Sequence, residues 1–226
     1  VVKISKQINT GEFFKNPAFL TAINHVKKNH SALHLMGMVS NGQSPHSDPD
    51  HLLALLSLAR KHQVKDVYLH LFTDGRDSPP RSSLKSIMAL ERSLQKNEVI
   101  ATIMGRFFAM DRKKAWERTT RAYNAMTFDR QEHKANSPQA GITRAYNANV
   151  TDEFIEPTTI IEKGHPVALI KDLDSVIFFN FREDRARELT RAFVLPDFDG
   201  FTRNKLDLSF VTLTEYERDL PVQIAF

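Results

Sequence analysis

Apolar positions along the chain follow two alternating patterns. Segments with apolar residues at intervals of three and four predict amphipathic helices, and short continuous apolar runs predict buried strands. The predicted helices cover residues 16–30, 48–63, 81–95, 111–126, 137–150 and 183–193. The predicted strands cover residues 32–39, 66–72, 98–104, 174–181 and 208–214. Residues 158–170 predict a hairpin that turns at Lys163 and Gly164.

This alternation of strands and helices predicts an α/β fold with a mainly parallel sheet and helices on both faces. The sequence contains no linker, low-complexity tract or break in composition. We therefore expect residues 1–226 to form a single domain.

Composition excludes several classes of protein. The chain is 41% hydrophobic and 26% charged, which is ordinary for a globular domain. It has no cysteine, which excludes disulfides, a thiol nucleophile and a cysteine-based zinc site. No apolar run approaches the roughly 18 residues that a membrane span needs. We expect a cytoplasmic protein, and the start "VVKISKQINTGEFF", without Met or a signal pattern, predicts a processed or excised piece.

The net charge of +4 permits an anionic partner without pointing to nucleic acid. Lys and Arg are scattered, and no block of five or six basic residues occurs. Neither glycine-rich phosphate-binding motif is present among the eight glycines. A phosphate would therefore be bound largely by arginine.

Charged residues follow the four strongest predicted strands. Ligands of open α/β sheets bind beyond the carboxyl ends of the strands, so these residues are predicted to meet at one edge. In strand order they are His46, then Arg76 and Asp77, then Arg106 and Arg112, and finally Arg182 and Arg185. The last two are predicted to share one face of the first turn of a helix.

These residue types suggest a small ligand with carboxylate, phosphate and hydroxyl groups. Guanidinium groups pair bidentately with carboxylate and phosphate. Five converging arginines would repel one another unless an anion of two or three charges sits among them. Asp77 would repel a phosphate, so we expect it to face substrate hydroxyls or to take protons from them.

Each residue also has an ordinary explanation. An arginine at a strand end can be solvated or can cap a helix, and His46 can be a loop residue without a ligand. Asp74 is expected to form a turn, with Gly75 supplying the backbone freedom. The segment "HSDPDH" (46–51) suggests a metal site, but Asp-Pro is also a helix start. Phe107 and Phe108 fit a core or a pocket wall. No motif for an attacking nucleophile is present.

The sequence resembles the cofactor-independent (2,3-bisphosphoglycerate-independent) phosphoglycerate mutases. The resemblance runs nearly end to end, and its motifs occur in the family's order. They are "GEFFKNPAF", "SALHLMGMVS", "DGRDSPP", "MGRFFAMDRKKAWERTTRAY", "TDEF", "VIFFNFREDRARELTRAF", "DFDGF" and "LTEY".

The resemblance implies a substrate-binding, or transferase, domain that is inserted into a phosphatase-like domain absent from this chain. The whole enzyme interconverts 3- and 2-phosphoglycerate through a phosphoserine, with two divalent metals, typically manganese, in the phosphatase-like domain. The inserted domain holds glycerate while it reorients. We expect this chain to bind no metal itself, to be monomeric, to bind neither nucleic acid nor membrane, and to be inactive alone. The alternative is a non-catalytic or redesigned domain that binds phosphate or carboxylate and keeps the fold without the activity.

By position, the resemblance assigns substrate binding to the seven strand-end residues. These are His46, Arg76, Asp77, Arg106, Arg112, Arg182 and Arg185, with Asp77 the candidate acid or base. The chain departs from the family at "SNGQSPHSD" (40–48), which is one residue longer than the usual "SDGGVHSH". Phe107 and Phe108 stand where the family commonly has two tyrosines.

Overall fold

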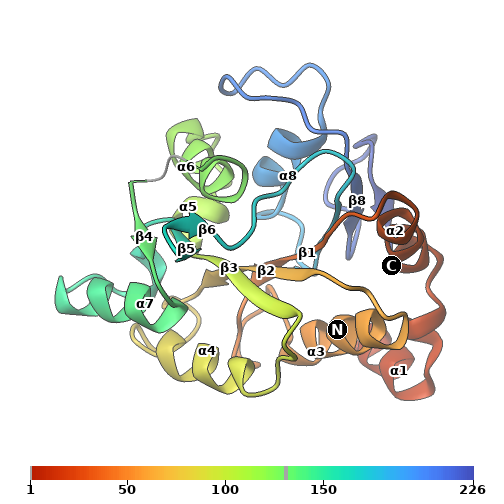
Figure 1. The fold of residues 1–226 in the computed structure, drawn as a ribbon, viewed down its shortest axis with the longest axis horizontal. Helices are drawn as coiled ribbons and strands as arrows, with labels where there is room; N and C mark the ends of the chain where they lie inside the picture. Colours follow the sequence, from red (N-terminus) through yellow and green to blue (C-terminus); the bar gives the residue numbers. More distant parts are fainter. Residues whose placement is uncertain (1, 130–131) are drawn as a thin grey trace.

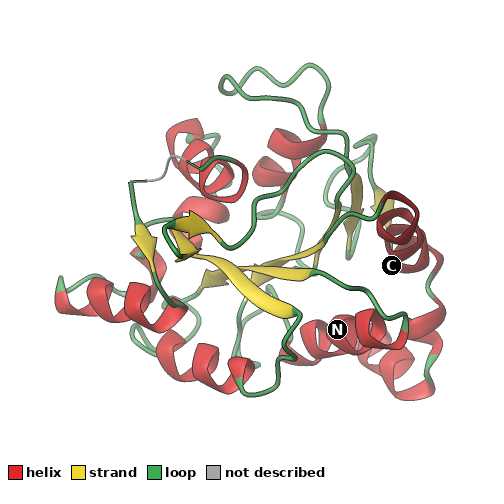
Figure 2. Cartoon of the chain, viewed as in Figure 1, coloured by secondary structure: helices red, strands yellow, loops and turns green. Residues whose placement is uncertain are grey.

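The computed structural model describes residues 2–129 and 132–226. Within these residues one nine-stranded sheet crosses the molecule, in the order β4-β5-β3-β2-β1-β7-β8-β9, and β6 pairs with β5 (Figures 1 and 2). The strands are β1 (Leu33–Met38), β2 (Val67–Thr73), β3 (Glu98–Gly105), β4 (Lys134–Ala135), β5 (Thr158–Glu162), β6 (His165–Pro166), β7 (Ser175–Phe178), β8 (Ser209–Thr212) and β9 (Gln223–Ile224).

The sheet is mainly parallel, as the sequence predicts. β3, β2, β1, β7, β8 and β9 run parallel to one another, and β4 runs parallel to β5. β5 is antiparallel to both β3 and β6. The predicted hairpin is the β5–β6 pair, and its turn has positive φ at Lys163 (51°) and Gly164 (87°).

Helices cover both faces of the sheet (Figure 1). One face is covered by α1 (Val2–Thr10), α2 (Pro17–Asn29), α3 (Pro49–Lys61), α4 (Ser83–Glu91) and α7 (Pro138–Asn147). The opposite face carries α5 (Arg106–Ala109), α6 (Trp116–Thr127) and α8 (Arg187–Val194). Two short 3-10 helices, η1 (Glu12–Lys15) and η2 (Asp152–Phe154), complete the helical elements of the described chain. None of the described helices has the length and apolar character to cross a membrane.

Each central strand divides its side chains between two apolar cores, because successive residues point to opposite faces. In β1, Leu33 and Leu35 join the core beneath α2 and α3, whereas Met36 and Met38 join the core beneath α6 and α8. All four side chains are at most 1% exposed. The central strands therefore read as continuous apolar runs, and this makes them easy to predict.

A row of hydrogen-bonded polar side chains runs through the core beneath α6 and α8. His34 Nε2 lies 3.1 Å from Asp174 Oδ2, and His34 Nδ1 lies 2.9 Å from His70 Nε2. His70 Nδ1 in turn lies 3.0 Å from Thr102 Oγ1. This row of polar side chains crosses β1, β2 and β3 and is fully buried, because both histidines and Thr102 are 0% exposed.

Two predicted helices begin later than their patterns suggest. The helix predicted over 111–126 begins at Trp116, because Asp111 Oδ2 accepts the backbone N–H groups of Lys113 and Ala115 and holds a loop there. The helix predicted over 183–193 begins at Arg187. Arg182 and Arg185 therefore precede the helix, and the prediction that they share its first turn is wrong.

Candidate functional site

The loops that follow β1, β2, β3 and β7 meet at one edge of the sheet. These strands are adjacent in the order β3-β2-β1-β7 and run parallel, so their carboxyl ends lie side by side. All seven strand-end residues singled out in the sequence lie in these loops or in the short helix α5. The structure brings them together in three groups, around Asp77, around Asp184 and at the exposed margin.

The turn after β2 is shaped by Asp74. Its Oδ1 accepts the backbone N–H groups of Arg76 (3.3 Å) and Asp77 (3.2 Å), and Gly75 adopts φ of +68°. Asp74 is therefore a turn former, as predicted. It is also 2% exposed, so its carboxylate needs a cationic partner as well.

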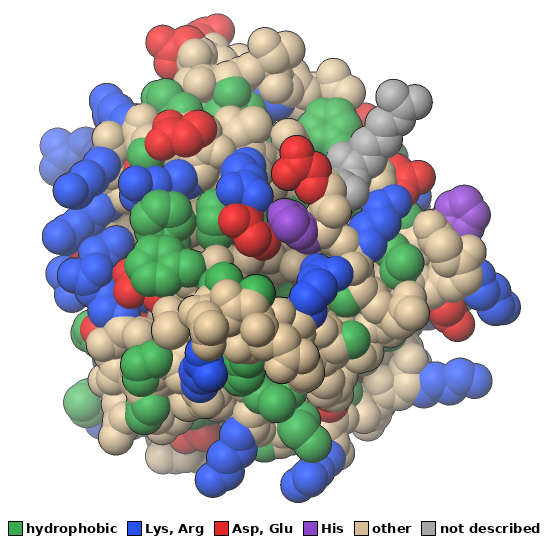
Figure 3. Space-filling model, turned by 90° about the vertical axis from the view of Figure 1, so that its left-hand side faces the viewer, with side chains coloured by type: hydrophobic (Ala, Val, Ile, Leu, Met, Phe, Trp, Pro, Cys, Tyr) green, Lys and Arg blue, Asp and Glu red, His purple; other side chains and the backbone are tan. Residues whose placement is uncertain are grey.

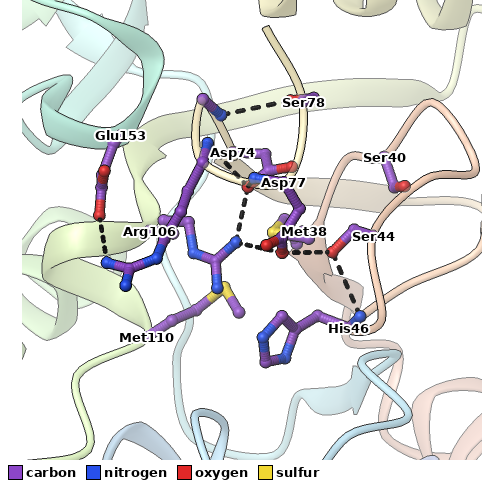
Figure 4. A network of polar contacts seen from close by, with 12 residues as sticks. Met38, Ser40, Ser44, His46, Asp74, Asp77, Ser78, Arg106, Met110 and Glu153 are labelled. Carbon is purple, nitrogen blue, oxygen red and sulfur yellow. Dashed lines mark hydrogen bonds and ion pairs between the residues drawn. The ribbon is translucent and has the colours of Figure 1, made fainter. Parts of the chain in front are cut away.

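Arg106 is that partner and also binds Asp77. Its Nη1 lies 2.6 Å from Asp74 Oδ1 and 2.6 Å from Asp77 Oδ2 (Figure 4). The Arg106 side chain is 3% exposed, and it is held at the start of α5 directly after β3. Burial alone would raise the pKa of Asp77, but the Arg106 guanidinium lowers it below its usual value. Asp77 is therefore ionised at neutral pH and acts as a hydrogen-bond acceptor.

His46 faces this ion pair from the loop after β1 (Figure 4). Its backbone N–H donates to Ser44 Oγ (3.2 Å), and its backbone C=O accepts from the N–H of Phe181 (2.9 Å). The ring is buried, and its Nδ1 has no hydrogen-bond partner among the described residues. Burial and the nearby Arg106 charge lower the pKa of His46 to about 4, against a weaker opposing effect of Asp184. The imidazole is thus neutral at pH 7 and has an unused polar atom in the site.

Asp184 joins two of the remaining arginines. Its Oδ2 lies 3.0 Å from Arg112 Nη1, and its Oδ1 lies 2.9 Å from Arg182 Nε. Arg185 donates from Nη1 to the backbone C=O of Met110 (3.2 Å). Burial together with the charges of Arg106 and Arg112 lowers the pKa of Arg185, and the nearby Asp184 opposes this effect only in part.

Arg76 lies at the exposed margin. Its Nη1 is 3.4 Å from Glu153 Oε1, and its side chain is 57% exposed. Glu153 belongs to η2, which packs closely on two glycines. A Cβ atom at Gly75 would lie 2.7 Å from the Glu153 backbone N, and one at Gly105 would lie 2.2 Å from the Glu153 backbone O. Only glycine at both positions allows η2 to approach the site this closely.

The expectation that only a bound anion could bring the arginines together is wrong. Carboxylates of the chain itself lie among them, so the repulsion between guanidinium groups is largely compensated. They are Asp74, Asp77, Glu153 and Asp184. Sequence reasoning missed the contacts of Glu153 and Asp184, although each is an acid inside a quoted motif, "TDEF" or "VIFFNFREDRARELTRAF".

The segment 46–51 does not form a metal cluster. Asp48 caps α3 by accepting the N–H of Asp50 (3.0 Å), and Pro49 is the first residue of that helix. His51 is fully buried and lies edge-on to Phe181. Across the described parts of the chain, no group of three or more Asp, Glu, His or Cys is arranged to hold a metal ion.

The two aromatic residues after Arg106 form a wall beneath α6. Phe108 is buried, and Phe107 contacts it edge-on at 5.1 Å between ring centroids. Arg118 lies over the Phe107 ring at 3.9 Å, and Arg121 lies over the Phe108 ring at 4.8 Å. The rings therefore support cationic side chains, which agrees with the predicted role as core or pocket wall.

The arrangement can bind and orient a small polar anion. It offers an ionised acceptor in Asp77, a neutral imidazole in His46 and guanidinium groups on the other sides. Guanidinium groups suit carboxylate or phosphate oxygens, and an ionised aspartate suits hydroxyl donors. The site holds a candidate proton acceptor and several anion-binding groups around it.

Comparisons with known proteins assign the chain to a family. The profile of the family described as "BPG-independent PGAM N-terminus" matches residues 4–218. A protein of Clostridium perfringens named 2,3-bisphosphoglycerate-independent phosphoglycerate mutase is 50% identical over 229 residues, covering 100% of this chain and 44% of its own length. A protein of Moorella thermoacetica with the same name is 47% identical over 230 residues, with the same coverage.

A solved structure gives the same result for the fold. A phosphoglycerate mutase of Leishmania mexicana, crystallised at low cobalt concentration, is 30% identical with a TM-score of 0.88. The match covers 96% of this chain and 41% of that protein, so the chain spans less than half the length of the proteins it resembles. With the family profile covering residues 4–218, the chain belongs to the family of N-terminal domains of 2,3-bisphosphoglycerate-independent phosphoglycerate mutases.

Proposed function

We propose that this chain is the substrate-binding domain of a phosphoglycerate mutase that interconverts 3- and 2-phosphoglycerate. The observation that carries the proposal is the ionised Asp77, fixed by Arg106 and faced by the neutral His46 and the arginines of the neighbouring loops. The names of the relatives support the same substrates. The phosphoserine and its phosphatase-like domain would lie in a part of the protein outside this chain.

In this proposal the domain holds the glycerate moiety while the phosphate is removed and returned. Asp77 accepts a hydrogen bond from a glycerate hydroxyl, and His46 Nδ1 contacts a second polar group. Arg112, Arg182 and Arg185 bind carboxylate or phosphate oxygens. Because its pKa is lowered, Asp77 is ionised when the substrate binds, and it accepts a hydrogen bond or a proton rather than donating one.

The charge balance of the site fits glycerate. Five arginines face four carboxylates while His46 is neutral, which leaves one positive charge uncompensated, at Arg185. Glycerate carries one negative charge, whereas phosphoglycerate carries up to three. We infer that this domain neutralises the carboxylate and that the phosphate charge is met elsewhere in the whole protein.

Divalent metals, expected to be manganese, would supply the positive charge that neutralises the phosphate in the phosphatase-like domain. They would activate the nucleophile and neutralise the transferring phosphoryl group there. The described residues of this chain contain no cluster suited to holding them. Binding and orientation of the substrate are therefore the tasks that this chain's own residues would perform.

Titration of the 15N-labelled chain with D-glycerate and with 3-phosphoglycerate tests the proposal. We expect chemical-shift changes at His46, Asp77 and Arg106, and weaker binding in Arg182→Ala and Arg185→Ala. The matched control is Lys61→Ala, which removes one positive charge from the exposed end of α3, on the side of the sheet opposite to the carboxyl ends of the strands. A folded chain that shows no shifts at millimolar ligand would overturn the proposal.

The second candidate is a phosphate- or carboxylate-binding domain that keeps the fold without serving a mutase. The altered loop 40–48 favours it, because this loop carries His46 in a sequence unlike the usual one. It is supported if inorganic phosphate or acetate binds as well as glycerate, and if Arg76→Ala and Arg182→Ala leave glycerate titrations unchanged.

Nucleic-acid binding has less support. Lys and Arg side chains gather along one edge of the face in Figure 3, but Asp and Glu side chains lie beside and between them. On this face the mixed charges do not form the continuous positive stripe that is typical of nucleic-acid binding.

A further inference from the structure

Ser44 connects the two polar side chains at the centre of the site (Figure 4). Its hydroxyl donates to Asp77 Oδ2 (3.1 Å), and the same oxygen accepts the backbone N–H of His46 (3.2 Å). Ser44 is 7% exposed, so water cannot easily replace either contact. One hydroxyl therefore fixes both the carboxylate of Asp77 and the backbone from which the His46 ring projects.

The loop around Ser44 is held on both sides. The next residue is Pro45, whose ring restricts φ and reduces the freedom of the turn. The backbone C=O of His46 accepts from the N–H of Phe181 (2.9 Å), and Ser47 Oγ donates to the backbone C=O of Met38 (2.5 Å). These contacts attach the loop to the ends of β7 and β1. The Ser44 hydroxyl is thus presented to Asp77 from a fixed backbone.

The contacts of Asp77 are confined to one of its two oxygens. Oδ2 receives both Arg106 Nη1 (2.6 Å) and the Ser44 hydroxyl (3.1 Å). Among the described residues Oδ1 has no side-chain partner in the site, and the Asp77 side chain is 27% exposed. Two donors on one oxygen fix the plane of the carboxylate and leave the other oxygen available to a ligand.

We propose that Ser44 is a positioning residue that orients Asp77 and His46 for the substrate. Its role in substrate binding rests on the function proposed above, whereas its effect on Asp77 does not. The hydroxyl also stabilises the ionised form of Asp77, since a hydrogen bond to the charged form lowers a carboxyl pKa.

The chain supplies a matched comparison in Ser40. Its Oγ accepts the backbone N–H of Gly42 (3.0 Å), just as Ser44 Oγ accepts that of His46 two residues on. Ser40 is equally buried, at 7% exposed, and lies in the same loop. Ser40 does not hydrogen-bond to Asp77. The loss of a loop serine that serves only the backbone is therefore expected in both Ser40→Ala and Ser44→Ala, whereas an effect on Asp77 is expected in Ser44→Ala alone.

The test measures the Asp77 pKa and glycerate affinity in the 226-residue chain. Carbon-13 NMR follows the Asp77 carboxyl through a pH titration in the wild type, Ser44→Ala, Ser44→Thr and Ser40→Ala. We expect the Asp77 pKa to rise in Ser44→Ala, to return towards the wild-type value in Ser44→Thr and to stay unchanged in Ser40→Ala. Glycerate affinity should fall about tenfold to a hundredfold in Ser44→Ala only, which corresponds to the loss of one hydrogen bond to a charged group.

The two readouts separate the two claims. An Asp77 pKa that is the same in Ser44→Ala as in Ser40→Ala overturns the positioning role. A raised Asp77 pKa in a chain whose wild type binds no glycerate supports the contact between Ser44 and Asp77 and counts against the proposed function instead. If Ser44→Ala does not fold, Ser44→Cys, which keeps the side-chain size with a weaker donor, gives the same comparison.

Discussion

Arg106 Nη1 lies 2.6 Å from Asp77 Oδ2, so the ends of β3 and β2 are joined by a buried ion pair at the centre of the site. The same nitrogen lies 2.6 Å from Asp74 Oδ1. Removing the guanidinium would leave two carboxylates near each other without their shared partner. This relationship makes Arg106 a structural residue as well as a ligand-binding one.

We expect Arg106→Ala to lower the free energy of unfolding by about 3–5 kcal/mol, the usual cost of leaving a buried charge without its partner. Arg76→Ala is the control from the same site. Its ion pair with Glu153 is 3.4 Å long and its side chain is 57% exposed, so its loss should cost at most about 1 kcal/mol. Urea denaturation at pH 7 measures both. Equal stabilities for the two variants would show that Arg106 only binds ligand.

His46 should make stability depend on pH. Burial and the Arg106 charge lower the pKa of His46 to about 4 in the folded chain, against 6.5 for an unperturbed histidine. The unfolded chain therefore binds a proton at a pH where the folded chain does not. The contribution is complete above pH 6.5 and is lost as the pH falls towards 4, by about 3 kcal/mol in total.

The measurement compares unfolding free energies of the wild type and His46→Gln from pH 7.5 to pH 4. Glutamine does not titrate, so the difference between the two proteins should change steadily between pH 6.5 and 4 and stay constant above pH 7. A constant difference over the whole range would mean that His46 titrates normally.

Thr102 should stabilise the buried row of polar side chains. Its hydroxyl lies 3.0 Å from His70 Nδ1, and both residues are 0% exposed. Thr102→Val would leave that nitrogen without a partner and cost about 1–3 kcal/mol. Thr212 is also 0% exposed, and its Oγ1 has no hydrogen-bond partner in the described structure, so Thr212→Val should be neutral or stabilising. Thermal unfolding of the two variants gives the comparison, and a more stable Thr102→Val would contradict it.

The sheet and most of the site could be predicted because both depend on local apolar patterns and on one topological rule. The runs in β1, β2, β3 and β7 are buried on both faces, and their parallel order places the following loops at one edge. This placed Arg106 and Asp77 together without any knowledge of contacts.

The parts that could not be predicted depend on single side-chain contacts. Asp111 holds a loop where the apolar spacing continues a helix, because its carboxylate accepts two backbone N–H groups. Asp184 lies in "REDR", which has the composition of a helix start, and its bridge between two arginines follows only from the folded loop. The two-residue strands β4 and β9 are too short to have a periodicity.

Gly105 should be required for the approach of η2 to the site. A Cβ atom there would lie 2.2 Å from the backbone O of Glu153, and backbone cannot move aside as a side chain does. We expect Gly105→Ala to cost roughly 2–3 kcal/mol of stability. Gly141→Ala is the control, since its nearest contact is the flexible end of Ile103 at 2.9 Å and alanine favours its helix α7. Melting temperatures that fall equally in both variants would contradict this.

The last prediction is that this chain alone does not interconvert 3- and 2-phosphoglycerate, even with manganese supplied. Phosphoryl transfer through an enzyme intermediate needs an activated nucleophile and charge-neutralising metal ions. The sequence contains no nucleophile motif, and the described residues contain no cluster arranged to hold a metal. Asp77 and the arginines can bind and orient glycerate, but they cannot accept a phosphoryl group and return it.

Binding alone leaves the reaction immeasurably slow, because enzymes accelerate phosphate-monoester chemistry by up to ~10²¹-fold. An enolase-coupled assay on the purified, manganese-loaded chain measures any turnover, and glycerate titration of the same sample shows that the site is intact. The expected result is binding without turnover. Turnover that persists through purification and disappears in Asp77→Asn would place a complete active site within these 226 residues. It would overturn the proposal that this chain binds the substrate while residues outside it carry out phosphoryl transfer.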